Sequence, residues 1–511
     1  MAALGCALSV GLIGLNAFVI QLQAFISPGL PHFSIIGLPD TSLNEARERV
    51  RSGCAACGFP WPGSRVTVNM SPASLPKRGS AHDLAIAASV LSASRTIPSN
   101  CLASTVVLGE LNLDGSVLPI NGLLPILLHV REQGLHSVIV PRANLEEAQL
   151  VPGLQVATVS HLGELMEMFD AHPRYSTRGE PLIADQAVAV PATQVPVGDM
   201  RDVVHQDAAK TALEVAAAGG HHLLMVGPPG TGKTMLASRM PGIMAPLDED
   251  AQFEVASIRS VCGTLRSTGI SSVPPFEAPH HSATAPALVG GGSGLGQPGA
   301  VTRAHHGVLF MDEAPEFAPR VLQTLREPLE SGMVAISRAK GTTVYPARFQ
   351  LVMAANPCPC GYGYGTGERC TCSERERIRY FGRLSGPILD RIDMQVEVDP
   401  IEHLDTGPDG NGPSSAEMRQ RVTTARSRAR ERFSPHGWTC NAQASGTWLR
   451  SHTPASILHV VNDALSAHRL SLRGADRAMR LSWTLADLAG RAQPSMDDIA
   501  MAIALRTKEL T

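Results

Sequence analysis

Residues 227–234 read G-P-P-G-T-G-K-T, which is the residue pattern of a phosphate-binding loop. Glycines at three of these positions let backbone N–H groups close around phosphate oxygens. Lys233 can reach the β and γ phosphates, and the Thr234 hydroxyl can bind Mg²⁺. The pattern therefore predicts an ATP-binding loop that consists of Gly227, Pro228, Pro229, Gly230, Thr231, Gly232, Lys233 and Thr234.

A phosphate loop needs an acidic element that holds Mg²⁺ and orients the attacking water. Residues 307–313, G-V-L-F-M-D-E, place two carboxylates after four apolar residues. We expect Asp312, at the end of a buried strand, to help hold Mg²⁺, and Glu313 to polarise the water. The alternative is that two exposed carboxylates merely end a strand.

A third polar side chain follows another apolar run. The segment F-Q-L-V-M-A-A-N ends in Asn356, whose amide could orient water or touch the γ-phosphate. Because Asn after a strand is usually a turn residue, this interpretation depends on the two preceding motifs.

The neighbouring segments predict the elements that would position the loop. Residues 221–226, H-H-L-L-M-V, indicate a short buried strand, and residues 233–240, K-T-M-L-A-S-R-M, indicate a helix. A strand before the loop and a helix after it are the context that a phosphate loop requires.

Four cysteines lie close together in a glycine-rich segment. Cys358, Cys360, Cys370 and Cys372 form the pattern C-x-C-x₉-C-x-C, and two close pairs of thiolates suit tetrahedral Zn²⁺. The alternative is four reduced cysteines in a flexible loop. For Cys54 and Cys57, which lie in helical sequence without a second pair, we expect core packing.

Composition limits the possible partners and the compartment. The 511 residues carry a formal net charge of −3, so any contact with nucleic acid must come from a local patch or a ring of subunits. The sequence contains no run of eighteen apolar residues, and residues 1–26 lack a basic leader, so we expect a cytoplasmic protein without a membrane span.

Alternation of strand-like and helix-like runs predicts an α/β protein with several domains. We expect an α/β domain at residues 1–170, a proline-containing linker at 171–200, and a second α/β domain at 201–402 that holds the phosphate loop. Residues 403–511 are expected to form a helical end domain.

The order of the motifs resembles the ComM/YifB group of magnesium-chelatase-like AAA+ ATPases. The resemblance includes "SGPILDRIDMQVEV" and "LSLRGADRAMRLSWTLADL" and covers nearly the whole chain. It implies an AAA+ core with a helical lid, a sensor role for Asn356, an arginine finger at Arg391 that reaches the neighbouring subunit, and a lid sensor at Arg473. A site shared in this way implies a ring, expected to be a hexamer. Without the resemblance, both arginines would be interpreted as surface charges.

The N-terminal region resembles the proteolytic domain of Lon, which cuts with a Ser-Lys dyad. The serine position of that motif falls on Ala81 and the lysine position on Leu124. Ser80 and Lys77 do not restore the pair without a register shift. We therefore expect a Lon-like fold without protease activity.

The resemblance also implies what ATP hydrolysis drives, namely branch migration of DNA by a hexameric helicase that integrates incoming single strands in natural transformation. Candidate DNA contacts are the predicted hairpin with Arg338, Lys340 and Arg348, and the segment "ERERIRYFGR" with Arg375, Arg377, Arg379 and Arg383 beside Tyr380 and Phe381. Both segments could equally be solvated surface. Two other hypotheses are a chelatase-like motor that remodels a protein partner and an ATP-dependent protease; the missing dyad disfavours the protease.

Overall fold

The computed structural model describes residues 3–37, 41–75, 77, 79–98, 102–173, 198–265, 269–292, 296–338, 341–364, 368–384, 386–400 and 412–506. Most of the predicted linker, the first part of the predicted lid and Lys340 lie outside these residues. The chain forms two compact units, one of residues 1–192 with 256–270 and one of residues 193–255 with 271–511.

Residues 256–270, which the sequence analysis assigned to the ATPase domain, group with the first unit. The Ser260 hydroxyl donates to the Glu147 carboxylate and accepts from the Leu124 N–H at 3.2 Å. Buried hydrogen bonds of this kind join segments that are far apart in the sequence, and no local pattern signals them.

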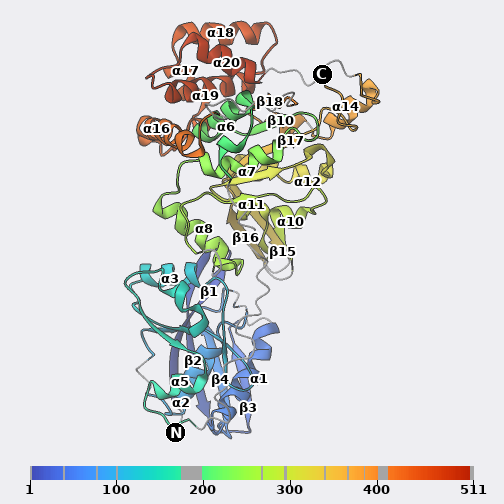
Figure 1. The fold of residues 1–511 in the computed structure, drawn as a ribbon. Coiled ribbons are helices and arrows are strands. Elements are labelled where there is room, and N and C mark those ends of the chain that lie inside the picture. The colour runs from blue at the N-terminus through green and yellow to red at the C-terminus, as the bar shows by residue number, and fades with distance from the viewer. Residues whose placement is uncertain are drawn as a thin grey trace. The chain divides into compact units, whose positions relative to one another are not determined.

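The first unit is built on a seven-stranded mixed sheet with the strand order β3-β4-β2-β1-β5-β8-β9. The longest pair, β1 and β2, is an antiparallel hairpin in register from Ala3–Ile26 to Ile13–Asn16. Helix α2 packs on this pair (Figure 1). All residues of α2 are buried. The strands and helices of this unit are β1 Ala3–Ile13, β2 Asn16–Ser27, β3 His32–Ile36, α1 Thr41–Ala56, β4 Arg65–Ser71, α2 Asp83–Ala93, β5 Thr105–Val107, β6 Glu110–Leu111, β7 Val117–Leu118, α3 Leu123–Glu132, β8 Ser137–Pro141, α4 Leu145–Ala148, β9 Gln155–Val159 and α5 Leu162–Glu167.

The second unit contains a five-stranded sheet with the order β11-β14-β17-β10-β18, in which every neighbouring pair is parallel. Strands β10, β14 and β17 are buried along their whole length, as expected for a parallel sheet covered on both faces. Because the strands are parallel, the residues that follow them meet at one edge. The strands of this unit are β10 Leu223–Val226, β11 Phe276–Glu277, β12 Gly290–Gly291, β13 Gln297–Pro298, β14 Val308–Met311, β15 Met333–Arg338, β16 Gly341–Pro346, β17 Gln350–Ala355 and β18 Met394–Glu397.

Helices α16 to α20, at the orange to red end of the ribbon in Figure 1, form the predicted helical end domain. Helix α16 begins with a capping box formed by Ser414 and Glu417 and contacts α6, α7 and α19. The rings of Trp448 and Trp483 lie 5.2 Å apart in the core of the helical end domain. The helices of the second unit are α6 Asp207–Gly219, α7 Lys233–Ile243, α8 Glu249–Val261, α10 Ala285–Val289, α11 Ala300–Arg303, α12 Pro319–Gln323, α13 Arg326–Ser331, α14 Glu374–Gly382, α15 Gly386–Leu389, α16 Ser415–Phe433, α17 Gly446–His452, α18 Ala455–Ser466, α19 Leu472–Leu488 and α20 Met496–Arg506; the end of α8 belongs to the first unit.

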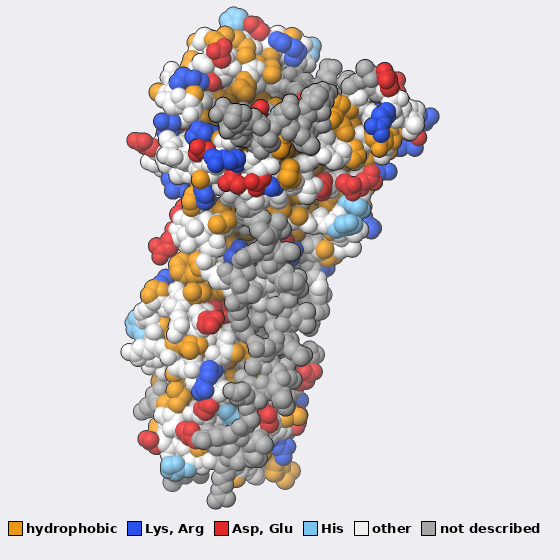
Figure 2. Space-filling model, viewed as in Figure 1, with side chains coloured by type: hydrophobic (Ala, Val, Ile, Leu, Met, Phe, Trp, Pro, Cys, Tyr) orange, Lys and Arg blue, Asp and Glu red, His pale blue; other side chains and the backbone are white. Residues whose placement is uncertain are grey.

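The surface carries charges of both signs. Figure 2 shows Lys and Arg side chains (blue) interspersed with Asp and Glu side chains (red) on the face in view, in agreement with the small net charge. Among the helices that the structure describes, none combines the length and the hydropathy that crossing a membrane requires.

Candidate ATPase site

The phosphate loop follows β10 and leads into α7, as the sequence predicts. A Cβ atom at Gly227 would lie 2.2 Å from the carbonyl oxygen of Val398, so this position accepts only glycine. Gly230 and Gly232 have φ angles of +83° and +86°, in the left-handed region that favours glycine. In the described part of the chain, the N–H groups of Gly230, Thr231 and Gly232 donate to no other main-chain group. These donors fit the phosphate oxygens of a nucleotide.

Lys233 lies buried at the base of this loop. Its Nζ donates to the carbonyl oxygens of Gly227 at 2.6 Å and Pro228 at 2.8 Å, and lies 3.4 Å from Oδ1 of Asn356. Burial lowers the pKa of Lys233, and the nearby charges of Asp312 and Glu313 act in the opposite direction. The ammonium group is thus held inside the loop, where phosphate oxygens would replace the carbonyl partners.

Thr234, in the first turn of α7, and Asp312, directly after β14, come together. The Thr234 hydroxyl donates to Oδ2 of Asp312 at 2.5 Å, and Oδ1 of Asp312 accepts the backbone N–H of Glu313 at 2.9 Å. A hydroxyl and a carboxylate oxygen side by side are the hard oxygen ligands that Mg²⁺ prefers. The residues present therefore fit the predicted Mg²⁺ site.

Glu313, two residues after the end of β14, has a left-handed backbone with φ at +49°. Its Oε2 lies 3.1 Å from Nδ1 of His281, which follows β11 in the neighbouring position of the sheet. His281 was not among the residues predicted for the site, although the segment A-P-H-H-S-A-T after a strand was a signal. Because His281 occupies Oε2 of Glu313, this contact must break before that oxygen can act on water.

Asn356 follows β17, and β17 lies between β10 and β14. This strand order places its amide between the phosphate loop and Asp312. Its backbone N–H donates to the hydroxyl of Tyr380 in α14, a buried side chain whose pKa is raised to about 12 by burial. Helix α14 therefore carries one aromatic side chain that packs against the site instead of facing outward.

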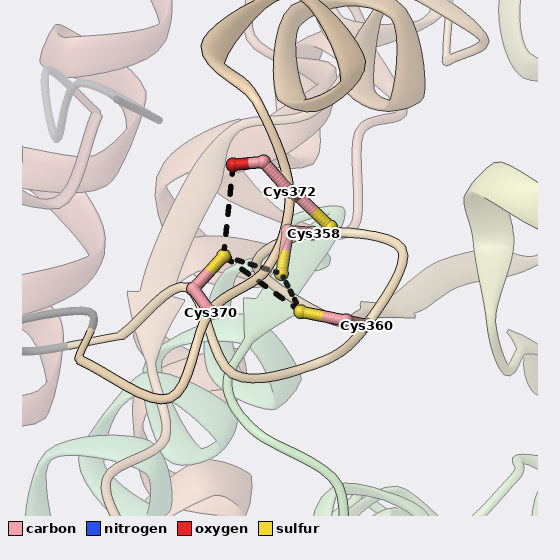
Figure 3. Close-up of side chains that lie close together, drawn as sticks. All are labelled: Cys358, Cys360, Cys370 and Cys372. Carbon is pink, nitrogen blue, oxygen red and sulfur yellow. Dashed lines mark hydrogen bonds between the residues drawn. The ribbon is translucent and has the colours of Figure 1, made fainter.

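The four predicted cysteine ligands converge in the segment between Asn356 and α14 (Figure 3). The Cys358 sulfur lies 3.3 Å from that of Cys360 and 3.7 Å from that of Cys370, and Cys360 and Cys370 are also 3.7 Å apart. All four sulfur atoms lie within 4.8 Å of one another. Backbone N–H groups of Tyr362 and Thr371 lower the pKa of the Cys360 thiol to about 6, whereas burial and the neighbouring thiols raise the pKa of Cys358.

The two predicted arginines lie at the other edge of the sheet. Strands β10 and β18 are in register from Leu223–Met394 to Val226–Glu397, and Asp393 and His222 exchange hydrogen bonds just before these strands. Arg391 precedes Asp393 by two residues. Four strand residues, or roughly 13 Å, therefore separate this edge from the edge that carries the phosphate loop.

Arg391 and Arg473 line one cavity of about 250 Å³ together with Arg477 and Arg480. Arg391 is buried and forms an ion pair with Glu330 at the end of α13. Burial lowers the pKa of Arg391, and the positive charges of Arg326, Arg473 and Arg477 lower it further. Crowded guanidinium groups of this kind favour an anion.

Glu254, His305 and His306 form a second group of possible metal ligands. Oε2 of Glu254 lies 2.8 Å from Nε2 of His305 and 2.7 Å from Nε2 of His306. Nδ1 of His305 accepts the backbone N–H of Arg348, so Nε2 carries the ring proton and donates to Glu254. A protonated nitrogen cannot bind a metal, and this group is therefore a hydrogen-bonded anchor before β14.

The predicted DNA-contacting segments differ in their exposure. The hairpin of β15 and β16 pairs from Met333–Pro346 to Arg338–Gly341, and the Met333 and Val344 side chains are exposed. On α14, Tyr380 is buried and Arg383 forms an ion pair with Glu316 at 3.0 Å. The predicted interleaving of arginine with aromatic rings on α14 therefore does not form one exposed surface.

Known protein families match most of the chain. Residues 199–406 match the family described as magnesium chelatase, subunit ChlI, residues 22–144 match subunit ChlI of Mg-chelatase, and residues 412–506 match the C-terminal part of the same subunit. The competence protein ComM of Haemophilus influenzae is 36% identical over 97% of this chain and 96% of its own length. The protein YifB of Salmonella typhimurium is 37% identical over 97% and 95%. The chain belongs to the ComM/YifB group of magnesium-chelatase-like AAA+ ATPases.

An uncharacterized protein of Mycobacterium tuberculosis is also similar to this ComM/YifB member, with 45% identity over 99% of both chains. Membership confirms the predicted AAA+ fold, and the family implies ATPase activity with ATP and Mg²⁺. A shorter match, 32% identity over 148 residues to Lon protease 2 of Bacillus subtilis, confirms the likeness to Lon.

The first unit of this ComM/YifB protein carries other residues at the positions of the protease dyad. Ala81 lies two residues before the start of α2, and Leu124 is buried in α3. Ser80 donates to the Glu110 carboxylate, and the buried Lys77 donates to the carbonyl oxygen of Pro72. The nearby serine and lysine are thus engaged with partners other than each other, so they do not form a dyad among the described residues.

Proposed function

We propose that this protein is a ring-forming ATPase motor, a hexamer, that acts on single-stranded or branched DNA and promotes branch migration during recombination or uptake of DNA. ATP and Mg²⁺ bind at the phosphate loop, and Zn²⁺ binds at the cysteine cluster. The observation that carries the ring is the position of the arginines at the sheet edge opposite the phosphate loop. The DNA part is supported by the similarity to a protein named for competence.

An arginine at the opposite edge cannot serve the nucleotide of its own chain. Arg391 is at least four strand residues from Gly227 along the sheet, and extended strands do not shorten. Arg473 lines the same cavity as Arg391, so both would face one neighbouring nucleotide. Each ATP is then held by the loop of one subunit and the guanidinium groups of the next, which a closed ring of heterologous contacts provides.

Hydrolysis in this arrangement follows from the side chains at the loop edge. The Gly230–Lys233 backbone and the Lys233 ammonium would bind the phosphates. Thr234 and Asp312 would hold Mg²⁺, which would supply positive charge to the β and γ phosphates. Glu313, once it leaves His281, orients the attacking water, and Asn356 positions that water or the γ-phosphate. Arg391 and Arg473 of the next subunit stabilise the charge of the transition state.

The contact with DNA is assigned to the β15–β16 hairpin. Arg338 ends β15 and pairs with Gly341, the first residue of β16. The apolar side chains of Met333 and Val344 are exposed on this hairpin, as expected for a segment that contacts another molecule. Lys340 lies outside the described residues. Arg348, at the base, is tied to His305 and His306 by its backbone and positions the hairpin.

The test is steady-state ATP hydrolysis by the purified chain without DNA, with single strands and with a four-way junction, with Glu313→Gln as the blank. We expect stimulation by DNA, and we expect Arg338→Glu to reduce the stimulation while Arg65→Glu, at an exposed position in the first unit, leaves it unchanged. Rings that hydrolyse ATP at the same rate with and without DNA would reject the DNA motor. The alternative is then a motor that remodels a protein partner, which the chelatase-subunit matches favour.

A further inference from the structure

The segment that carries the cysteines is anchored to the nucleotide site at both ends. Cys358 follows Asn356 by two residues, and α14 begins two residues after Cys372 and carries Tyr380, which accepts the Asn356 N–H. A Cβ atom at Gly361 would lie 2.6 Å from Cγ of Pro229, so the segment packs directly on the phosphate loop. Tyr364 donates to Asp399, beyond the end of β18.

The sulfur atoms have the spacing of a tetrahedral metal site. Zinc binds thiolates at about 2.3 Å, which places neighbouring sulfurs roughly 3.8 Å apart. The distances of 3.3, 3.7 and 3.7 Å among Cys358, Cys360 and Cys370 are close to this value. The Gly363 N–H donates to the Cys358 sulfur at 3.1 Å. A hydrogen bond of this kind orients the sulfur of a metal ligand and stabilises its thiolate form. A disulfide would need about 2.05 Å, and all four cysteines are free.

The segment between the cysteines offers little apolar surface of its own. Between Cys358 and Cys372 the sequence is rich in glycine, and of the four cysteines only Cys358 is buried. Such a segment buries too little apolar surface to fold by itself, and a bound metal would supply the missing free energy. The same segment contacts Pro229 and directly follows Asn356 in the chain. A fixed conformation of this segment therefore helps to fix the conformation of the nucleotide site.

We propose that Cys358, Cys360, Cys370 and Cys372 hold one structural Zn²⁺, and that this ion fixes the wall of the nucleotide site, so that ATP binding and hydrolysis depend on zinc. The inference rests on the proposed ATPase site and adds that zinc controls nucleotide binding at this site. Removal of the ion frees the segment, and Pro229 and Asn356 lose a packing partner and a fixed backbone. Nucleotide affinity and turnover then fall together.

The experiment measures zinc content and nucleotide affinity in the same preparations of the full chain. We expect one Zn²⁺ per chain in reduced protein, and fluorescent-ADP binding about tenfold weaker or more after zinc is removed with a thiol-reactive mercurial and a chelator, with Mg²⁺ resupplied. Addition of Zn²⁺ after reduction should restore binding. Replacement by Co²⁺ should give the visible absorption of a tetrahedral thiolate site.

The double variant Cys370→Ser/Cys372→Ser should lose both zinc and nucleotide affinity. Cys6→Ser, a partly exposed cysteine of β1 outside the cluster, should keep both. Reduced wild-type protein without zinc would overturn the site. Zinc that can be removed without a change in nucleotide affinity would overturn its control of the ATPase site. All these measurements omit DNA, so they can be interpreted even if the proposed DNA motor is wrong. If the double variant does not fold, reversible removal of zinc from the wild-type protein still tests the proposal.

Discussion

At the scale of single residues, Lys233 and Glu313 are expected to contribute to different steps. Lys233→Ala removes an ammonium that contacts the loop carbonyls and would contact phosphate, so nucleotide binding should weaken. Glu313→Gln keeps every phosphate contact and should bind ATP normally while kcat falls by about 10²-fold or more, the usual contribution of a positioned base. Binding and turnover measured on both variants check this. Normal turnover by Glu313→Gln would remove it from the mechanism.

His281 is a residue whose role the contact with Glu313 suggests. His281→Ala releases Oε2 of Glu313, so we expect DNA-independent hydrolysis to rise about tenfold, the effect of one hydrogen bond to a charged group. His280→Ala is the matched control, because the His280 ring nitrogen is bonded to Ser282 instead. A fall in basal hydrolysis would show that His281 positions Glu313 for the reaction and does not restrain it.

At the scale of elements, Asp393 joins β18, the start of β10 and α19. It accepts from the His222 N–H at 2.9 Å and from Arg477 at 2.7 Å. Burial acts to raise the pKa of Asp393, but the neighbouring His221 ring and the Arg477 guanidinium outweigh it and hold the pKa below its usual value. The pKa of Asp393 is higher in the unfolded chain than in the folded one. Its carboxylate therefore stabilises the second unit fully above about pH 4, and this stabilisation is lost as the pH falls below that value.

Asp393→Asn should therefore lower the free energy of unfolding by about 3 kcal/mol at pH 7, because buried guanidinium groups lose their counter-charge. It should also make stability less dependent on pH below about 4 than in wild type. Unfolding of the C-terminal helices is followed by fluorescence of Trp448 and Trp483, which lie in their core. Equal pH slopes in the two proteins would contradict the ionised state of Asp393 in the fold.

At the scale of the whole molecule, shared nucleotide sites predict rescue between defective subunits. Arg391→Ala keeps its phosphate loop, and Lys233→Ala keeps its arginines. Random mixing in equal amounts makes about a quarter of the interfaces complete, so each inactive variant should regain a measurable part of wild-type hydrolysis when mixed with the other. Arg473→Ala should behave like Arg391→Ala. Stable mixed rings without any rescue would place the arginines outside the shared site.

The sequence by itself determined the parts of this protein that depend on neighbours in the chain. An apolar run followed by Lys233, Asp312 or Asn356 predicted buried strands with polar residues at their ends, because strand burial and loop geometry are local properties. The same holds for the cysteine pattern and for the capped helices of the end domain. These local patterns also sufficed for the fold class, which the family matches confirm.

Only the tertiary structure decided which of these pieces meet. The parallel register of β10 and β18 sends Arg391 to the edge opposite Gly227, and strand order brings His281 to Glu313. The packing of Gly361 on Pro229 and the hydrogen bonds of Ser260 likewise join residues more than one hundred positions apart. Such contacts depend on the packing of whole sheets and helices, and a chain of 511 residues carries no local pattern that specifies them.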